Sequence, residues 1–334
     1  MRPSIQYKTL VASEDSSGDI LLEMKQLSTD DLPDHDVLIR VLYSSLNYKD
    51  ALSATGNRGV TKTYPHTPGI DAAGIVEYSR DHRFSAGEEV IVTSYDLGMN
   101  TPGGFGEYIS VPGDWIVPLP DGLTLKESMI TGTSGFTAAY GVKKIADQGI
   151  KPSAGNVLVS GATGAVGSFA VALLARLGYS VTAATGKTDK HDFLRELGAS
   201  QVIPRQDVTG PADQPLLPAK WIAAVDTVGG SFLDSILRQI KHNGVVSCCG
   251  NILGHELHTS VYPFILRGVS LMGIDSGICL MEDRKMIWEL LSTSWKLNSF
   301  NRMYREVKPE NLPGEISFML KGMQTGKIVV TLPG

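Results

Sequence analysis

Hydrophobic and polar residues alternate along the first third of the chain in a pattern typical of β-structure. The apolar residues fall in short runs rich in β-branched side chains, and glycine, proline or acidic residues bound each run. These runs are "DVLIRVLYSSLN" (36–47), "GIDAAGIVEYS" (69–79), "GEEVIVTSY" (87–95) and "GEYISVP" (106–112). No helix of ordinary length is predicted before residue 124, so this part is expected to be β-rich.

From Leu125 onward, short apolar segments alternate with segments of helix length. Two helices are predicted in "KESMITGTSGFTAAYGVKKIADQG" (126–149), and six strands follow. The predicted strands cover residues 156–160, 180–185, 201–204, 223–228, 244–250 and 269–275. Such alternation is typical of a parallel sheet covered on both faces, and six strands match a doubly wound α/β dinucleotide-binding fold.

The C-terminal segment completes the predicted organisation. A long helix, "MEDRKMIWELLSTSWKLN" (281–298), leads to "EISFMLKGMQTGKIVVTLPG" (315–334), which is predicted to form a helix and a strand that return to the N-terminal domain. We therefore expect a β-rich catalytic domain of residues 1–124 and 296–334, and a nucleotide-binding domain of residues 125–295.

The turn after the first of the six strands carries glycines at the spacing G-x-x-G-x-x-G, at Gly161, Gly164 and Gly167. Glycines there let the chain turn without side-chain obstruction, so that the N–H groups at the start of the next helix face a pyrophosphate. A strand-to-helix turn without any ligand could carry the same glycines. The strand–turn–helix–strand context favours phosphate binding.

The end of the second strand indicates which dinucleotide would bind. An NAD-selective site places an acidic residue there, whereas this strand runs through Thr185 and Gly186 to Lys187 with no carboxylate before Asp189. Arg205, just after the third strand, could add a second cation. Both basic residues could instead be ordinary solvated charges, but the pattern favours the 2′-phosphate of NADPH.

Composition and charge exclude several classes of partner. The net charge is −5 with no block of lysine or arginine, which argues against nucleic acid. The longest apolar run, near "FAVALLA" (169–175), is far shorter than the roughly 20 residues of a membrane span. The N-terminus has no apolar segment of signal-peptide length, and three cysteines cannot form a disulfide framework. We expect a cytoplasmic protein with no membrane partner.

The sequence offers no evident metal ligands or covalent nucleophile. Only "HELH" (255–258) places two of the seven histidines close together, without the helix or third ligand of a zinc site. Cys248 and Cys249 alternate faces of a predicted strand, so they are expected to be small core residues. No G-x-S-x-G nucleophile motif occurs. Chemistry without metal is expected.

Motifs spread over nearly the whole chain resemble the zinc-free medium-chain dehydrogenase/reductase superfamily. They are "SSLNYKDALSATG" (44–56), "PHTPGIDAAGIV" (65–76), "GTSGFTAAY" (132–140), "GATGAVG" (161–167), "AVDTVGG" (224–230) and "PFILRGVSLMGIDS" (263–276). The set is most similar to the quinone-oxidoreductase-like branch that includes NADPH-dependent acryloyl-CoA reductase. This resemblance implies a Rossmann domain joined to a GroES-like catalytic domain. Zinc-bearing relatives place a cysteine near Asn47 and a His-Glu pair near Ile70 and Asp71, and these ligands are missing here.

The resemblance also implies a set of cofactor contacts. Thr163, Gly164, Ala165 and Val166 would contact the pyrophosphate, in the turn that also carries Gly161 and Gly167. The 2′-phosphate end would meet Thr185, Gly186, Lys187 and Arg205. The nicotinamide side would be approached by Asn251, Ile265 and Ser276, with Tyr48 reaching the cofactor from the other domain across the cleft.

Tyr48 is the candidate catalytic residue. Its phenol could donate to a thioester oxygen or protonate a carbon, or the ring could merely pack against the nicotinamide. Asn47 and Asp50 are expected to brace the turn through hydrogen bonds to backbone groups.

The expected activity is reduction by NADPH of the β-carbon of a conjugated enoyl thioester, with acryloyl-CoA giving propionyl-CoA, by a homodimer without zinc. Reduction of quinones is one alternative, and a non-catalytic NADPH-binding protein is another.

Overall fold

The computed structural model describes residues 2–298 and 300–333, which form two compact units. The first unit comprises Met1–Thr133, Gly277–Ser292 and Met303–Gly334, and the second comprises Ser134–Ser276 and Thr293–Arg302. These units differ from the predicted domain limits at residues 125–133, 277–292 and 296–302, each of which groups with the other unit. The residues at which the predicted catalytic and nucleotide-binding domains begin and end stay a prediction.

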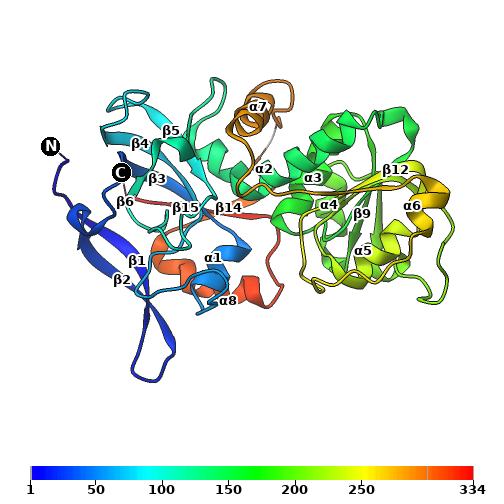
Figure 1. The fold of residues 1–334 in the computed structure, drawn as a ribbon, viewed down its shortest axis with the longest axis horizontal. Helices are drawn as coiled ribbons and strands as arrows, with labels where there is room; N and C mark the ends of the chain where they lie inside the picture. The colour runs from blue at the N-terminus through cyan, green and yellow to red at the C-terminus, as the bar shows by residue number, and fades with distance from the viewer. Residues whose placement is uncertain (1, 299, 334) are drawn as a thin grey trace. The chain divides into compact units, whose positions relative to one another are not determined.

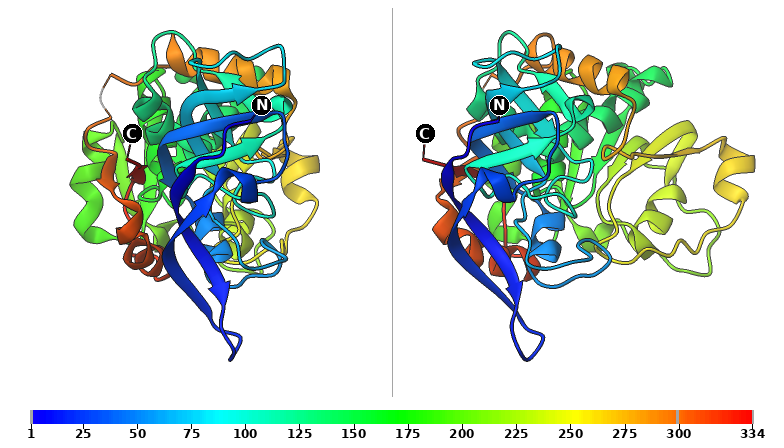
Figure 2. Two further views of the ribbon diagram at one scale, coloured as in Figure 1. Left: turned by 90° about the vertical axis from the view of Figure 1, so that its left-hand side faces the viewer. Right: turned by 60° about the vertical axis from the view of Figure 1, so that its left-hand side comes forward.

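The first unit is built on a seven-stranded sheet with the order β14-β15-β3-β4-β5-β7, and β6 also pairs with β3. Its strands are β3 Val37–Leu46, β4 Asp71–Ser79, β5 Glu89–Thr93, β6 Tyr108–Val111, β7 Ile116–Pro118, β14 Tyr304–Val307 and β15 Lys327–Thr331. A separate hairpin, which the sequence pattern did not predict, consists of β1 Gln6–Glu14 and β2 Ile20–Ser28. Figure 2 shows the turn of this hairpin projecting from its unit.

The helices of the first unit are few and mostly short. They are α1 Tyr48–Ser53, α7 Met281–Ser292 and α8 Leu312–Leu320, with 3₁₀ turns at Thr29–Asp31, Gly113–Trp115 and Pro309–Asn311. The helix that was predicted to extend to Asn298 ends at Ser292, where the run "STS" begins. Hydroxyl side chains compete with the helix for backbone hydrogen-bonding groups. Apolar residues of β3, β4 and β5 form the core with α8, through side chains such as Val41, Val92 and Ile316.

Strand β15 returns from the C-terminal segment to pair antiparallel with β3. The register places Ile328 opposite Leu46, so that Lys327, the first residue of β15, comes beside the end of β3. This pairing brings together residues about 280 positions apart in the sequence.

The second unit is a six-stranded parallel sheet with the order β10-β9-β8-β11-β12-β13. Its strands are β8 Asn156–Val159, β9 Ser180–Thr185, β10 Gln201–Pro204, β11 Trp221–Asp226, β12 Ile240–Cys248 and β13 Ser270–Gly273. Helices lie around it (Figure 1): α3 Ala165–Arg176, α4 His191–Glu196, α5 Gly230–Leu237 and α6 Tyr262–Arg267, with 3₁₀ turns at Pro152–Ala154, Thr188–Lys190 and Arg205–Asp207. When the six strands are numbered in chain order, their order across the sheet is 3-2-1-4-5-6. This order confirms the predicted doubly wound fold.

Two of these strands begin earlier than predicted. β11 begins at Trp221, and β12 begins at Ile240 because the strand includes the polar residues "KHN" that precede the apolar run.

Helix α2, Leu125–Asp147, is the segment in which two helices were predicted. It is interrupted at Gly132, whose backbone has φ +49° and ψ −164°. Among the described helices, none is both long enough and apolar enough to cross a membrane.

Candidate functional site

The glycine turn of the second unit joins β8 to α3. Gly161 has φ +54°, and a Cβ added there would lie 2.4 Å from the Thr227 hydroxyl oxygen. A Cβ added at Gly167 would lie 2.4 Å from the carbonyl oxygen of Gly161. Gly161 is therefore required by its positive φ and by the close approach of Thr227, and Gly167 by close packing of the helix on the turn. Gly164 is the N-cap of α3 and has no side chain that could cap the helix. The N–H groups of the first turn of α3 are thus available to an anion.

The carboxyl ends of β8 and β11 are fixed next to this turn by Asp226. Its buried carboxylate accepts hydrogen bonds from the Ser160 hydroxyl at 2.7 Å and from the Gly229 N–H at 2.9 Å. Burial raises the pKa of Asp226 above its usual value. Asp226 could not be singled out from the sequence, because an acidic residue at the end of an apolar strand gives no sign of its partners. Asp226 keeps the rim of the sheet in place at the end where ligands of such folds bind.

The end of β9 brings two predicted cofactor contacts together. Parallel pairing sets Pro204 opposite Thr185, so Arg205 follows beside Gly186. A Cβ added at Gly186 would lie 3.4 Å from Arg205 Cδ and Nε, which shows that the arginine side chain lies over this glycine. The Lys187 N–H donates to the Thr185 hydroxyl at 3.1 Å, and burial lowers the pKa of Lys187. Two cations thus stand at the end of β9, where the sequence predicts contacts to a 2′-phosphate.

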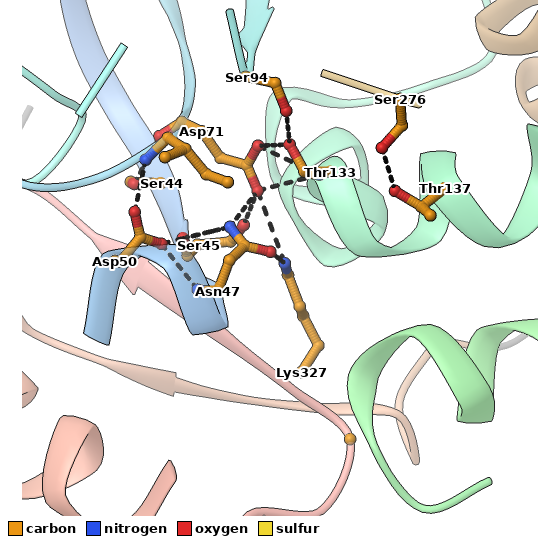
Figure 3. Close-up of polar contacts among 12 residues, drawn as sticks. Ser44, Ser45, Asn47, Asp50, Asp71, Ser94, Thr133, Thr137, Ser276 and Lys327 are labelled. Atoms are coloured by element: carbon orange, nitrogen blue, oxygen red, sulfur yellow. Dashed lines mark hydrogen bonds and ion pairs between the residues drawn. The ribbon is translucent and has the colours of Figure 1, made fainter. Parts of the chain in front are cut away.

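The remaining predicted contacts of this unit lie after β12. Asn251 is exposed in the loop that follows, and this loop packs on Gly229, where an added Cβ would be 3.0 Å from the Asn251 Cα. Ile265 lies on α6 with 68% of its surface exposed. The hydroxyls of Ser276 and Thr137 are 2.6 Å apart (Figure 3). No hydrogen bond among the described residues joins Asn251 or Ile265 to the glycine turn.

Tyr48 is the first residue of α1 in the first unit, and 44% of its surface is exposed. Asn47 and Asp50, in the same turn, brace the helix as predicted. The Asp50 carboxylate accepts hydrogen bonds from the N–H of Asn47 and from the N–H of Ile70, each at 2.7 Å. Asp50 is fully buried, and this burial, with the nearby charge of Asp71, raises its pKa to about 7.

A buried polar cluster lies around the start of α1 (Figure 3). We call it the Asp71 cluster, and its members are Ser45, Asn47, Asp50, Asp71, Ser94, Thr133 and Lys327.

Asp71 accepts hydrogen bonds from the Ser45 hydroxyl at 2.5 Å, from the Asn47 side-chain amide at 2.8 Å and from the Thr133 hydroxyl at 2.6 Å. The Thr133 N–H also donates to this carboxylate, at 3.0 and 3.1 Å to its two oxygens. Asp71 therefore holds both the backbone and the side chain of Thr133, directly after the break at Gly132.

Sequence reasoning did not single out Lys327, Thr133 or Ser94. Lys327 reads as an ordinary surface lysine before the apolar run "IVV", yet it is almost fully buried. One signal of the cluster was present in the sequence. Asn47 and Asp71 are polar residues at or near the positions where zinc-bearing relatives have metal ligands, so without a metal they would need other buried partners. Within residues 2–298 and 300–333, no three His, Cys, Asp or Glu side chains come together as a metal site would require.

Comparison with known proteins identifies the family. Residues 33–121 match the alcohol dehydrogenase GroES-like domain, and residues 165–293 match the zinc-binding dehydrogenase domain. Over 321 residues, the chain is 46% identical to "Putative quinone oxidoreductase YhfP" of Bacillus subtilis, covering 96% of this chain and 97% of that protein. The chain belongs to the medium-chain dehydrogenase/reductase family.

Two further proteins extend this result. The acrylyl-CoA reductase AcuI of Ruegeria pomeroyi is 41% identical over 325 residues, covering 97% of this chain and 98% of AcuI. The crystal structure of the yhdH oxidoreductase from Salmonella enterica in complex with NADP has a TM-score of 0.95 and 39% identity, covering 98% of this chain and 100% of that one. A crystal structure of YhfP with NAD bound has the same TM-score at 45% identity and the same coverage. This medium-chain dehydrogenase/reductase thus shares its fold with nicotinamide-bound relatives along nearly its whole length.

Proposed function

We propose that this protein is an oxidoreductase that uses NADPH. The observation that carries the proposal is the glycine turn: Gly161 and Gly167 admit no side chain, and the N-terminus of α3 has N–H groups open to a pyrophosphate. These features fit the diphosphate of a dinucleotide. The two relatives crystallised with NADP and NAD support the same cofactor class.

The proposed contacts follow from this turn. The pyrophosphate would be held by Gly161, Thr163, Gly164, Ala165, Val166 and Gly167, and the nicotinamide end by Tyr48, Asn251, Ile265 and Ser276. The 2′-phosphate would be held by Thr185, Gly186, Lys187 and Arg205. The choice of NADPH over NADH rests on the two cations, Lys187 and Arg205, and on the lack of an acidic residue at the end of β9.

The proposed reaction is reduction of a conjugated enoyl thioester, acryloyl-CoA, to propionyl-CoA without zinc. NADPH supplies the hydride when it is bound. The substrate accepts this hydride at its β-carbon, negative charge builds on the thioester oxygen, and the α-carbon then takes a proton. Tyr48 is proposed to donate a hydrogen bond to that oxygen, a role open to it because much of its side chain is exposed. One such donor is typically worth about 3 kcal/mol of barrier, or roughly a hundredfold in rate.

Similarity to AcuI supports the enoyl thioester as the acceptor. A second candidate is a quinone, supported by the higher identity to YhfP, and the same hydride delivery would serve it. The experiment that separates them measures kcat/KM with NADPH for acryloyl-CoA, crotonyl-CoA and a series of p-quinones. Higher kcat/KM for acryloyl-CoA supports the proposal, and higher values for quinones overturn it. Failure to turn over any acceptor would favour a non-catalytic NADPH-binding protein. Dialysis against a chelator should leave the turnover intact.

The role of Tyr48 is tested by Tyr48→Phe, which removes only the hydroxyl. We expect kcat to fall by roughly a hundredfold with NADPH affinity unchanged. Tyr78→Phe, on β4 of the same unit, is the matched control and should keep full activity. A loss confined to cofactor affinity would mean that Tyr48 packs on the nicotinamide and does not donate.

We also propose a cytoplasmic homodimer. Strand β13 is the outermost of the described strands at one side of the parallel sheet, and Val261, Tyr262 and Leu266, in and beside α6, expose large apolar surfaces. A strand at a sheet edge next to apolar side chains is suited to pairing with a second copy. Light scattering coupled to size-exclusion chromatography would give the mass, and a monomer at micromolar concentration would contradict this assembly.

A further inference from the structure

Lys327 is a buried cation whose ammonium group, among the described residues, has its partners in the Asp71 cluster. Only 3% of its surface is exposed, and its ammonium group lies 2.7 Å from the Asn47 amide oxygen and 3.5 Å from an Asp71 carboxylate oxygen (Figure 3). Lysine is rarely this buried unless it is paired, because removing an ammonium group from water is costly. Burial accordingly lowers the pKa of Lys327.

The immediate effect of Lys327 is to orient the side chain of Asn47. An ammonium group can only donate, and a carboxylate without its proton can only accept. The Asn47 oxygen therefore faces Lys327, and its NH₂ group faces Asp71 at 2.8 Å. Because both ends of the amide are held, Asn47 has one orientation within the cluster.

Asn47 in turn fixes the start of α1. It is the N-cap residue, its own N–H is held by Asp50, and Tyr48 follows it directly. Asn47 and Asp50, in the same turn as Tyr48, are thus anchored in the interior, whereas 44% of the surface of Tyr48 is exposed. This is the arrangement expected when a rigid support presents one reactive group.

The rest of the cluster resists movement of this support. Gly132 leaves room for Asp71 and Lys327, which a Cβ at this position would approach to 2.6 and 3.0 Å. Ser94 and Tyr95 have φ of +62° and +52°, and the Ser94 hydroxyl lies 2.9 Å from that of Thr133. Backbone strain in residues other than glycine persists where surrounding contacts enforce it, and it gathers at functional sites.

We propose that Lys327 is a positioning residue of the reaction, which acts through Asn47 and the first turn of α1 to place the phenol of Tyr48. This inference rests on the proposed function, in which Tyr48 donates to the substrate. A lysine that only stabilised the fold would have no special connection to Tyr48.

The test is a double-mutant cycle of Lys327→Met and Tyr48→Phe, measured in the full-length protein with NADPH and acryloyl-CoA. We expect Lys327→Met to lower kcat about tenfold, with KM and NADPH affinity little changed, because small displacements of a catalytic group cost rate. In the Tyr48→Phe background the same change should have almost no further effect on kcat. Lys321→Met, at an exposed lysine just after α8, is the matched control and should leave kcat unchanged.

A second variant keeps the test valid if Lys327→Met does not fold. Asn47→Ala leaves the charges of Lys327 and Asp71 in place and removes only the amide that links them to α1. It should show the same kcat loss and the same dependence on Tyr48.

Each outcome decides between the proposals. Equal losses of kcat in the Tyr48 and Tyr48→Phe backgrounds, or no loss at all, would overturn the positioning role. If Tyr48→Phe alone retains full kcat, the donor role of Tyr48 in the proposed function fails, whatever Lys327→Met does.

Discussion

Replacing Gly132 by alanine should be unusually destabilising, and the structure allows the magnitude to be worked out. Its φ of +49° and ψ of −164° lie close to a region that essentially only glycine adopts, at a cost of about 1–3 kcal/mol for other residues. The added Cβ would also lie 2.6 Å from an Asp71 carboxylate oxygen, 2.7 Å from the Ser45 hydroxyl and 3.0 Å from the Lys327 ammonium. All three atoms are buried and held by hydrogen bonds or ion pairs, so relieving the contact adds about 1–3 kcal/mol of overpacking. The expected loss in unfolding free energy is about 4 kcal/mol in total.

Urea unfolding of the protein without cofactor, followed by tryptophan fluorescence, measures this loss. A change of this size should lower the midpoint by about 1–2 M. The matched control is Gly322→Ala in the same unit. Gly322 has φ +68°, but nothing lies within 4 Å of the position that its Cβ would take, so only backbone strain of about 1–2 kcal/mol should appear.

The comparison of the two variants separates backbone strain from packing. If Gly132→Ala costs no more than Gly322→Ala, the Asp71 cluster yields freely to an extra methyl group. That result would refute the view of the cluster as a rigid support, and with it the physical basis for the role of Lys327.

Three further predictions concern the cofactor and pH. Gly167→Ala should abolish NADPH binding while the fold is retained in circular dichroism, because its Cβ would lie 2.4 Å from the carbonyl oxygen of Gly161; undiminished affinity would contradict the proposed turn. Lys187→Ala should weaken NADPH binding at least about tenfold, or about 1.4 kcal/mol, and leave NADH binding unchanged in fluorescence titrations. The exposed Lys151 provides the control, and equal losses for both cofactors would exclude phosphate recognition. Asp50, with its pKa raised to about 7, holds its proton to higher pH in the folded than in the unfolded chain, so its contribution to stability falls as pH rises from about 4 to 7. Asp50→Asn should flatten that fall in urea unfolding between about pH 4 and 7; an unchanged pH slope would mean that Asp50 titrates normally.

The parallel sheet and its glycine turn could be predicted from the sequence because their signals are local. Each strand of the second unit is a short apolar run, each helix has its own periodicity, and Gly161 and Gly167 lie within one turn of chain. The absence of an acidic residue before Asp189 is likewise a local fact. Where prediction of an element failed, as at the start of β12, polar residues inside the strand hid the local pattern.

The polar support beneath Tyr48 was decided by tertiary structure alone. Asn47 and Lys327 meet because β15 pairs with β3 in one register, and Asp71 meets Thr133 because α2 breaks at Gly132. Neither contact leaves a trace in the pattern around the residues themselves, since a lysine before an apolar strand looks the same whether it is solvated or buried. The sequence could indicate Tyr48 and its bracing neighbours, which lie within four consecutive residues. It could not reveal Lys327, because the partner that compensates the burial of its charge is supplied by the pairing of β15 with β3, between residues 280 positions apart.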